Sequence, residues 1–189
     1  LMDMAPRGLP VFQAPSLPDQ VTAEEMSKYV QDPIVAKMEQ DGCVVRNACD
    51  YQSATGGAQP VEMLGHSMKA VQLPKGGSLT YSFYAKPGAA VLYTALIPTQ
   101  ANDKGDIRYS VSVDGGEPVV YSLKEPFRSE RWKVNVLRGQ ALRSTPITLE
   151  GGNHTLVITA LDDHIVVDQW MIDYNPDRSF YMFPVKPAM

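Results

Sequence analysis

Residues 78–84 place Leu, Tyr and Phe in alternation with Ser, Thr and Ser. Successive side chains of a β-strand point to opposite faces of a sheet, so this alternation predicts a strand with Leu79, Tyr81 and Phe83 on its buried face. The same period of two runs along the chain from Cys43 onward, with turn residues about every ten positions. Such spacing is typical of an antiparallel β-sandwich or barrel.

We expect about eight strands in a β-sandwich domain that covers residues 41–175. Asp114-Gly115-Gly116-Glu117 predicts a hairpin, because glycine supplies the positive φ angles of tight hairpin turns. Trp170 lies in an alternating segment and is expected in the core. The expected strands cover residues 78–84, 90–96, 108–113, 119–123, 132–137, 145–149, 155–161 and 165–173.

The two ends of the chain differ from this strand-rich region. Four prolines within residues 1–20 predict a linker or strap, and its apolar residues suggest that it packs on the sandwich or on a partner domain. Residues 21–40 are predicted to form a short helical segment, because Thr22-Ala23-Glu24-Glu25 matches a capping box. Residues 176–189 form an irregular, proline-containing tail.

Net charge and hydropathy exclude two classes of partner. The formal net charge of −4 gives no basic field for phosphates, so we expect neither nucleic acid nor an anionic membrane as a partner. No apolar run approaches the roughly 18 residues of a membrane span. The chain opens Leu1-Met2-Asp3-Met4, which predicts a fragment or processed product with any export signal upstream. Cys43 and Cys49 lie in an extended segment, about 20 Å apart, and are expected to be free thiols.

Motifs for catalysis and metal binding are missing from the sequence. No Gly-x-Ser-x-Gly nucleophile elbow occurs, and His66, His154 and His164 have no metal-ligand spacing. Asp162-Asp163 is interpreted as a polar turn between two strands. A glycosidase would instead need Asp162, Asp163 or Asp168 to face a second carboxylate across a cleft. We therefore expect no catalytic residue and no metal ligand.

Sugar binding is the one chemistry for which the sequence offers candidates. Flat aromatic rings cover the apolar face of a sugar while polar groups bind its hydroxyls. The predicted contact centres on the loop from Pro98 to Tyr109 and on the region around Trp132. The alternative is that the loop is a solvated turn, Arg108 a surface residue and Trp132 part of the core. The candidate carbohydrate-binding residues are Gln100, Asn102, Arg108, Tyr109 and Trp132.

Residues 77–174 resemble the C-terminal domain of glycoside hydrolase family 115, the xylan α-1,2-glucuronidases. The segment at 2–12 also resembles the stretch that leads into that domain. The resemblance rests on the order and spacing of several blocks, which are Tyr81-Ser82-Phe83-Tyr84, Leu96-Ile97-Pro98-Thr99-Gln100, the run at 107–118, Trp132, Gly152-Asn153-His154-Thr155-Leu156 and the run at 166–173.

The resemblance implies an all-β fold, an antiparallel β-sandwich of the galactose-binding or carbohydrate-binding-module jelly-roll type, with a short N-terminal helix and Pro-rich ends. It implies a non-catalytic accessory domain of a secreted or periplasmic enzyme, which supports domain packing, a homodimer or the substrate cleft. The partners are then the catalytic domain of the parent chain and plant polysaccharide. The alternative is a free-standing carbohydrate-binding module for xylan or glucuronoxylan, which would expose two or more of Tyr51, Tyr93, Tyr109 and Trp132 on one surface.

One departure from related domains concerns calcium. Related domains often begin the sandwich with an acidic Glu-Ala-Glu segment, and in calcium-bearing sandwich lectins such a strand helps to hold the ion. Here the stretch at 45–51 reads Val-Arg-Asn-Ala-Cys-Asp-Tyr, so two carboxylates are missing. This departure argues against a structural Ca²⁺, and we expect no cofactor.

Overall fold

The computed structural model describes residues 37–38, 40–98, 106–125, 128–178, 180, 182–185 and 187–188. The expected linker 1–20, most of the expected helical segment 21–40, and Gln100 and Asn102 lie outside these residues. Residues 37, 38, 40 and 41 are helical. No helix in the described part of the chain is long and apolar enough to cross a bilayer.

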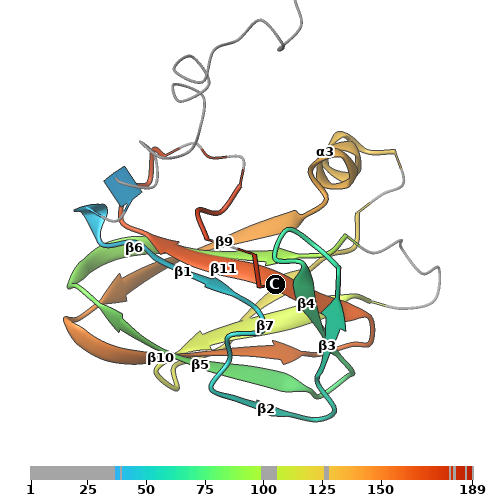
Figure 1. The fold of residues 1–189 in the computed structure, drawn as a ribbon, viewed down its shortest axis with the longest axis horizontal. Coiled ribbons are helices and arrows are strands. Elements are labelled where there is room, and N and C mark those ends of the chain that lie inside the picture. The colour runs from blue at the N-terminus through green and yellow to red at the C-terminus, as the bar shows by residue number, and fades with distance from the viewer. Residues whose placement is uncertain are drawn as a thin grey trace, which may run out of the picture. The chain divides into compact units, whose positions relative to one another are not determined.

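Strands dominate the described residues and form two antiparallel sheets that pack face to face (Figure 1). This confirms the predicted antiparallel β-sandwich. The elements are β1 (Val44–Asn47), β2 (Ser53–Thr55), β3 (Gln59–Glu62), β4 (Lys69–Leu73), β5 (Ser78–Ala85), β6 (Gly88–Leu96), β7 (Arg108–Val113), β8 (Val119–Ser122), α3 (Glu130–Arg138), β9 (Ala141–Leu149), β10 (Gly152–Ala160) and β11 (Ile165–Asp173).

Strand β11 is central in the larger sheet, whose order is β3-β4-β11-β6-β9. One edge of β11 pairs with β6, and the other edge is shared between β4 and β1. Its register shifts between Val167 and Gln169, which places an irregularity at Asp168. The smaller sheet has the order β2-β5-β10-β7-β8, and the predicted hairpin at 114–117 joins β7 to β8.

The core between the sheets follows the predicted alternation. Leu79, Tyr81 and Phe83 of β5 are buried, as expected for the inner face of a half-buried strand. Trp170 of β11 has no exposed surface, and its ring meets Tyr81 and Phe83 edge-on with centroids 5.3 and 5.5 Å apart. The predicted core position of Trp170 is confirmed.

The C-terminal tail packs on the outer face of the larger sheet. Because side chains alternate along a strand, Tyr93 of β6 and Met171 of β11 face away from the Trp170 core. They join a second apolar cluster with Phe180 and Phe183 of the tail, and the Tyr93 and Phe180 rings are 5.1 Å apart. Strand β11 is therefore covered on both faces.

The strand predicted at 132–137 is wrong, because these residues lie in helix α3. The side chain of Ser129 caps the helix by accepting a hydrogen bond from the Trp132 N–H at 3.2 Å. Gly139 ends the helix with a left-handed φ of 72°. The alternation of Trp132, Val134 and Val136 is typical of a half-buried strand, but the caps at Ser129 and Gly139 favour the helix that forms.

The two cysteines are free, as predicted. Strand β1 separates them, and each thiol packs beside a different apolar cluster, Cys43 on the outer side of the larger sheet and Cys49 at the core. The Cys43 thiol also donates to Asp173 Oδ1 at 3.2 Å, and burial together with this carboxylate raises the pKa of Cys43 to about 12. Cys43 is therefore an unreactive thiol at neutral pH.

Candidate functional site

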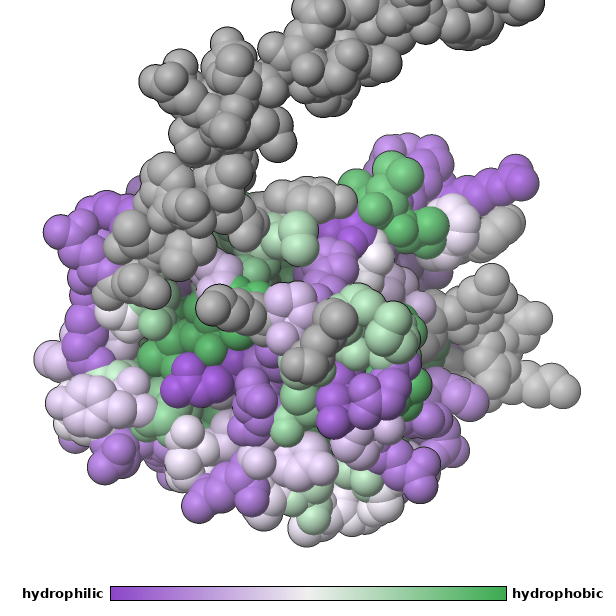
Figure 2. Space-filling model, viewed as in Figure 1, coloured by the Kyte–Doolittle hydropathy of each residue, from purple (hydrophilic) through white to green (hydrophobic). Residues whose placement is uncertain are grey.

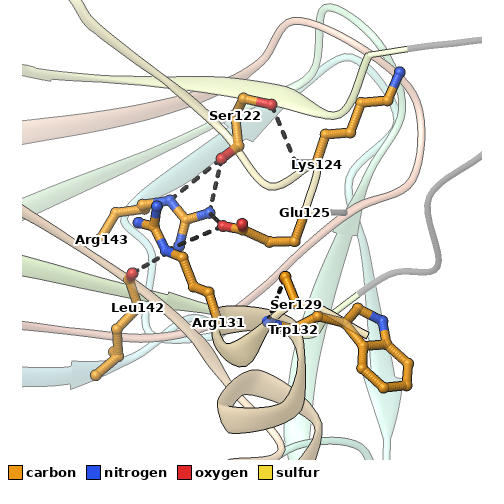
Figure 3. A network of polar contacts seen from close by, with 8 residues as sticks. All are labelled: Ser122, Lys124, Glu125, Ser129, Arg131, Trp132, Leu142 and Arg143. Carbon is orange, nitrogen blue, oxygen red and sulfur yellow. Dashed lines mark hydrogen bonds and ion pairs between the residues drawn. The ribbon is translucent and has the colours of Figure 1, made fainter. Parts of the chain in front are cut away.

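Helix α3 projects from one end of the sandwich and is fixed at its N-terminus by a network of charged groups (Figure 3). Glu125, which precedes the helix, accepts a hydrogen bond from buried Arg143 of β9 at 2.9 Å and forms an ion pair with Arg131 of α3 at 3.1 Å. Arg143 also donates to the carbonyls of Ser122 and Leu142 at 2.8 Å each. Burial and neighbouring Arg131 lower the pKa of Arg143, while Glu125 acts in the opposite direction. The network ties β8, α3 and β9 together.

The C-terminus of α3 is fixed as well. The Gly139 N–H donates to the carbonyls of Asn135 and Val136, which completes the αL cap. The His66 ring, on the loop between β3 and β4, is hydrogen-bonded through Nε2 to the Arg138 carbonyl at 2.8 Å. A helix pinned at both ends presents its outer side in a fixed orientation.

The outer side of α3 carries three exposed apolar side chains next to the Glu130–Lys133 ion pair. At 100° per residue, Asn135 lies opposite the arc that holds Val134, Val136 and Leu137. Asn135 is buried, whereas these three side chains are 58%, 52% and 82% exposed. Figure 2 shows them as a green projection at the upper right, over α3. We call Val134, Val136 and Leu137 the α3 apolar surface. A surface helix normally buries its apolar stripe, so the α3 apolar surface is a candidate interaction surface.

Of the predicted sugar-binding residues, Arg108 is already paired. Its guanidinium binds Asp162 through Nε at 2.9 Å and Nη2 at 3.2 Å, and its own N–H donates to the same carboxylate. This pairing raises the pKa of Arg108 and lowers that of Asp162. A sugar carboxylate would have to displace Asp162. Sugar binding by Arg108 stays a prediction, as it does for Gln100 and Asn102, which lie outside the described residues.

Tyr109 requires a correction. Its side chain has no exposed surface and its hydroxyl is hydrogen-bonded to Thr94 Oγ1 at 2.6 Å, because β7 turns this position into the core. The ring therefore offers no stacking face. Trp132 is half-buried on α3, and in Figure 3 its indole points away from Arg143 and Glu125.

The aromatic residue that the site prediction missed is Tyr84. It is 71% exposed at the end of β5, whereas Tyr51, Tyr93 and Tyr121 are half-buried. Opposite Tyr84 in register lies Asn153 of β10. The signal was in the sequence, because the alternation that buries Phe83 turns Tyr84 to the wet face of the sheet.

The acidic residues considered for catalysis have other partners. Asp162 and Asp163 lie in the turn between β10 and β11, as predicted, where Asp162 binds Arg108 and Asp163 accepts the Lys75 N–H at 3.0 Å. Asp168 is buried among hydrogen-bond donors, and Asp173 is bound to Arg178. Each carboxylate is thus occupied by a cation or by N–H groups instead of facing a second acid.

The ring of His154 has partners within the fold. His154 lies between Asp114 Oδ2 at 2.6 Å and the Glu150 carbonyl at 2.7 Å, and it stacks on Phe83. Across the residues that the structure describes, no group of three or more His, Cys, Asp or Glu side chains is placed to hold a metal ion.

Solved structures with this fold include enzymes and carbohydrate-binding modules. A family GH115 4-O-methyl-α-glucuronidase, BtGH115A, with specificity for decorated arabinogalactans, is 36% identical over 70% of this chain with a TM-score of 0.64. The C-terminal CBM6 of the laminarinase LamC from Zobellia galactanivorans is 12% identical over 69% of this chain and 98% of that chain, with a TM-score of 0.51. The CBM6 module of Cellvibrio mixtus lichenase 5A, in complex with cellotriose, is 14% identical over 70% of this chain and 97% of that chain, with the same TM-score. The two modules show the fold alone.

The sequence itself matches a family model. No curated protein matches the chain. The model of the glycosyl hydrolase family 115 C-terminal domain matches residues 38–186, which include every described strand and α3. The chain covers 17% of the length of BtGH115A. The chain therefore belongs to the family of glycosyl hydrolase family 115 C-terminal domains.

Proposed function

We propose that this chain is a non-catalytic accessory domain of a family 115-like polysaccharide-degrading enzyme, and that its α3 apolar surface docks on the catalytic part of that enzyme. The observation that carries the proposal is the inverted helix: α3 buries Asn135 and exposes Val134, Val136 and Leu137. Such an enzyme meets plant polysaccharide outside the cell, so we place it in a secreted or periplasmic compartment.

The comparison of lengths supports the catalytic part of the enzyme as the partner of the α3 apolar surface. A chain that covers 17% of a related glucuronidase is, in that enzyme, joined to a much longer polypeptide. Covering a Val or Leu side chain contributes about 1.5–3 kcal/mol, so three of them supply a docking energy of several kcal/mol. Charged residues lie next to these side chains: Arg131 is exposed, and exposed Lys133 is paired with Glu130 at 2.7 Å.

The test is to replace Leu137 and Val134 with serine in the intact parent enzyme. We expect the docked domain to loosen, because the double variant removes about 3 kcal/mol or more of apolar burial at the contact. Calorimetry should then resolve a separate transition for this domain.

The matched control is Val120→Ser, an apolar residue of β8 that is 53% exposed and lies outside α3. In the isolated chain the Leu137/Val134 double variant and the Val120→Ser control should each change the free energy of unfolding by only about 0.5 kcal/mol, because all three side chains face solvent. A parent enzyme whose calorimetric trace is unchanged by the α3 variant would contradict the proposal. A change confined to oligomeric state would assign the surface to a second copy instead.

Sugar binding by the outer face of the smaller sheet is the second candidate function. The exposed ring of Tyr84 favours it, with Asn153 opposite and the hydroxyls of Ser82 and Thr155 two register positions away, on the same face of the sheet. Xylan and glucuronoxylan fragments are the ligands that we propose for this face. One stacking ring contributes on the order of 1 kcal/mol, so millimolar affinity is expected.

Titration of the isolated chain with xylan and glucuronoxylan oligosaccharides tests this candidate. Tyr84→Ala should abolish the millimolar binding, because it removes the ring on which a sugar would stack. The backbone pairing of β5 is unaffected, so the fold should be kept. Met63→Ala is the control, since Met63 is 69% exposed in the loop after β3. Wild-type chain that fails to bind, or binding that survives in Tyr84→Ala, would eliminate this face.

A further inference from the structure

Asp168 is a buried carboxylate surrounded by hydrogen-bond donors. Its side chain has no exposed surface. Oδ1 accepts from the Ser67 N–H at 3.0 Å and from the Ser67 hydroxyl at 2.5 Å. Oδ2 accepts from the His66 N–H at 2.8 Å and from Gln140 Nε2 at 2.8 Å. We call these four donors the Asp168 cage.

The Asp168 cage lies directly beside the strand that is acidic in related domains. Asn47 of β1 is in register with Gln169, and the Ala48 N–H donates to the Asp168 carbonyl at 2.8 Å. Within the stretch 45–51, for which the resemblance implies an acidic segment, this chain has the amide of Asn47, whose Oδ1 accepts from Gln169 Nε2 at 3.1 Å. Uncharged amides thus replace acidic ligands next to Asp168.

Calcium does not fit this arrangement. The ion takes six to eight oxygen ligands at about 2.3–2.6 Å, several of them charged. Both oxygens of Asp168 instead receive N–H and O–H groups, whose positive ends face the position that a cation would take. Four donors also compensate the burial of the carboxylate, because each one replaces a hydrogen bond that water would make. The Asp168 cage is therefore a carboxylate held by N–H and O–H groups, and it leaves no free carboxylate oxygen for a cation.

We propose that the Asp168 cage takes the place of a structural calcium ion, so that this sandwich folds and keeps its shape independently of metal. The cage connects three elements: β11 through Asp168, the loop between β3 and β4 through His66 and Ser67, and the start of β9 through Gln140. Because His66 also binds the Arg138 carbonyl, the cage fixes the C-terminal end of α3.

Thermal unfolding of the purified chain in excess EDTA and in millimolar CaCl2 tests the proposal. We expect the same Tm in both, whereas a saturated structural calcium would raise it by roughly 5–10 °C. Asp168→Asn should lower Tm by roughly 10 °C in both conditions, because its amide brings a fifth donor into the cage. Asp163→Asn is the matched control, since that carboxylate is exposed and accepts only the Lys75 N–H among the hydrogen bonds described.

Ser67→Ala keeps the test decisive if Asp168→Asn does not fold. It removes one donor and should lower Tm by a few degrees, again equally with and without calcium. A calcium-dependent rise in the wild-type Tm that disappears in Asp168→Asn or Ser67→Ala would overturn the proposal. So would wild-type insensitivity to calcium combined with variants as stable as Asp163→Asn, because the cage would then not support the fold.

Discussion

Replacing Arg178 with methionine is expected to lower the free energy of unfolding of the chain by about 3–5 kcal/mol. The Arg178 side chain is 8% exposed, its Nε donates to Asp173 Oδ2 at 2.6 Å, and its Nη2 binds Asp41. Asp173 has no exposed surface, so the variant leaves a buried carboxylate without its cation. Methionine keeps most of the volume, and the loss therefore reports charge and hydrogen bonding.

Urea unfolding at neutral pH measures this effect, and Arg108→Met is its control. Arg108 makes a comparable two-point contact with Asp162, but its side chain is 45% exposed, so solvent screens the pair and the loss should be much smaller. The hydrogen bond from Arg178 holds the pKa of Asp41 below its usual value of 3.8. The Arg178–Asp41 contact therefore contributes to the free energy of unfolding above pH 3.8, and this contribution is lost as pH falls through the lowered pKa of Asp41. Part of the stability difference between the wild type and Arg178→Met should then disappear in acid. Equal losses for both arginine variants would show that burial does not control the Arg178 contact.

Gly65→Ala is expected to cost roughly 3–4 kcal/mol of unfolding free energy. Gly65 has a φ of 77°, and a Cβ there would lie 2.4 Å from Asp168 Oδ1. The left-handed backbone accounts for about 1–2 kcal/mol and the displaced carboxylate for most of the rest.

Gly76→Ala separates these two contributions, again by urea unfolding. Gly76 has a similar φ of 86°, but no atom lies within 4 Å of the Cβ position. It should therefore show the backbone strain alone, about 1–2 kcal/mol. If the two alanine variants lose the same stability, the contact between the loop at Gly65 and Asp168 contributes nothing.

The strands were predictable where one face is buried and the other is wet. Leu79, Tyr81 and Phe83 alternate with small polar residues, and the register of β5 follows from that pattern. Helix α3 was not predictable in this way, because Trp132, Val134 and Val136 alternate at a period of two. A period of two favours a strand, whereas the caps at Ser129 and Gly139 favour the helix that forms.

The sequence shows which residue types could bind a ligand, but it does not show which distant residues the fold brings next to them. Arg108 and Asp162 are 54 positions apart, and their pairing arises from the meeting of β7 with the turn after β10. Asp168 was considered as a possible catalytic acid, yet the loop at 63–68 and Gln140 surround it with donors from distant parts of the chain. Tyr109 falls inside because the register of β7 puts it there.

The central place of β11 has a consequence for the order of folding. It is the last strand among the residues that the structure describes, and it supplies the pairing edges for β1, β4 and β6. During synthesis β1, β4 and β6 lack this shared neighbour until residue 173 has been made, although β4 already has β3 beside it and β6 has β9. Loop closure over such sequence separations is slow, so this domain should collapse only late, in one cooperative step and after most of its chain is available.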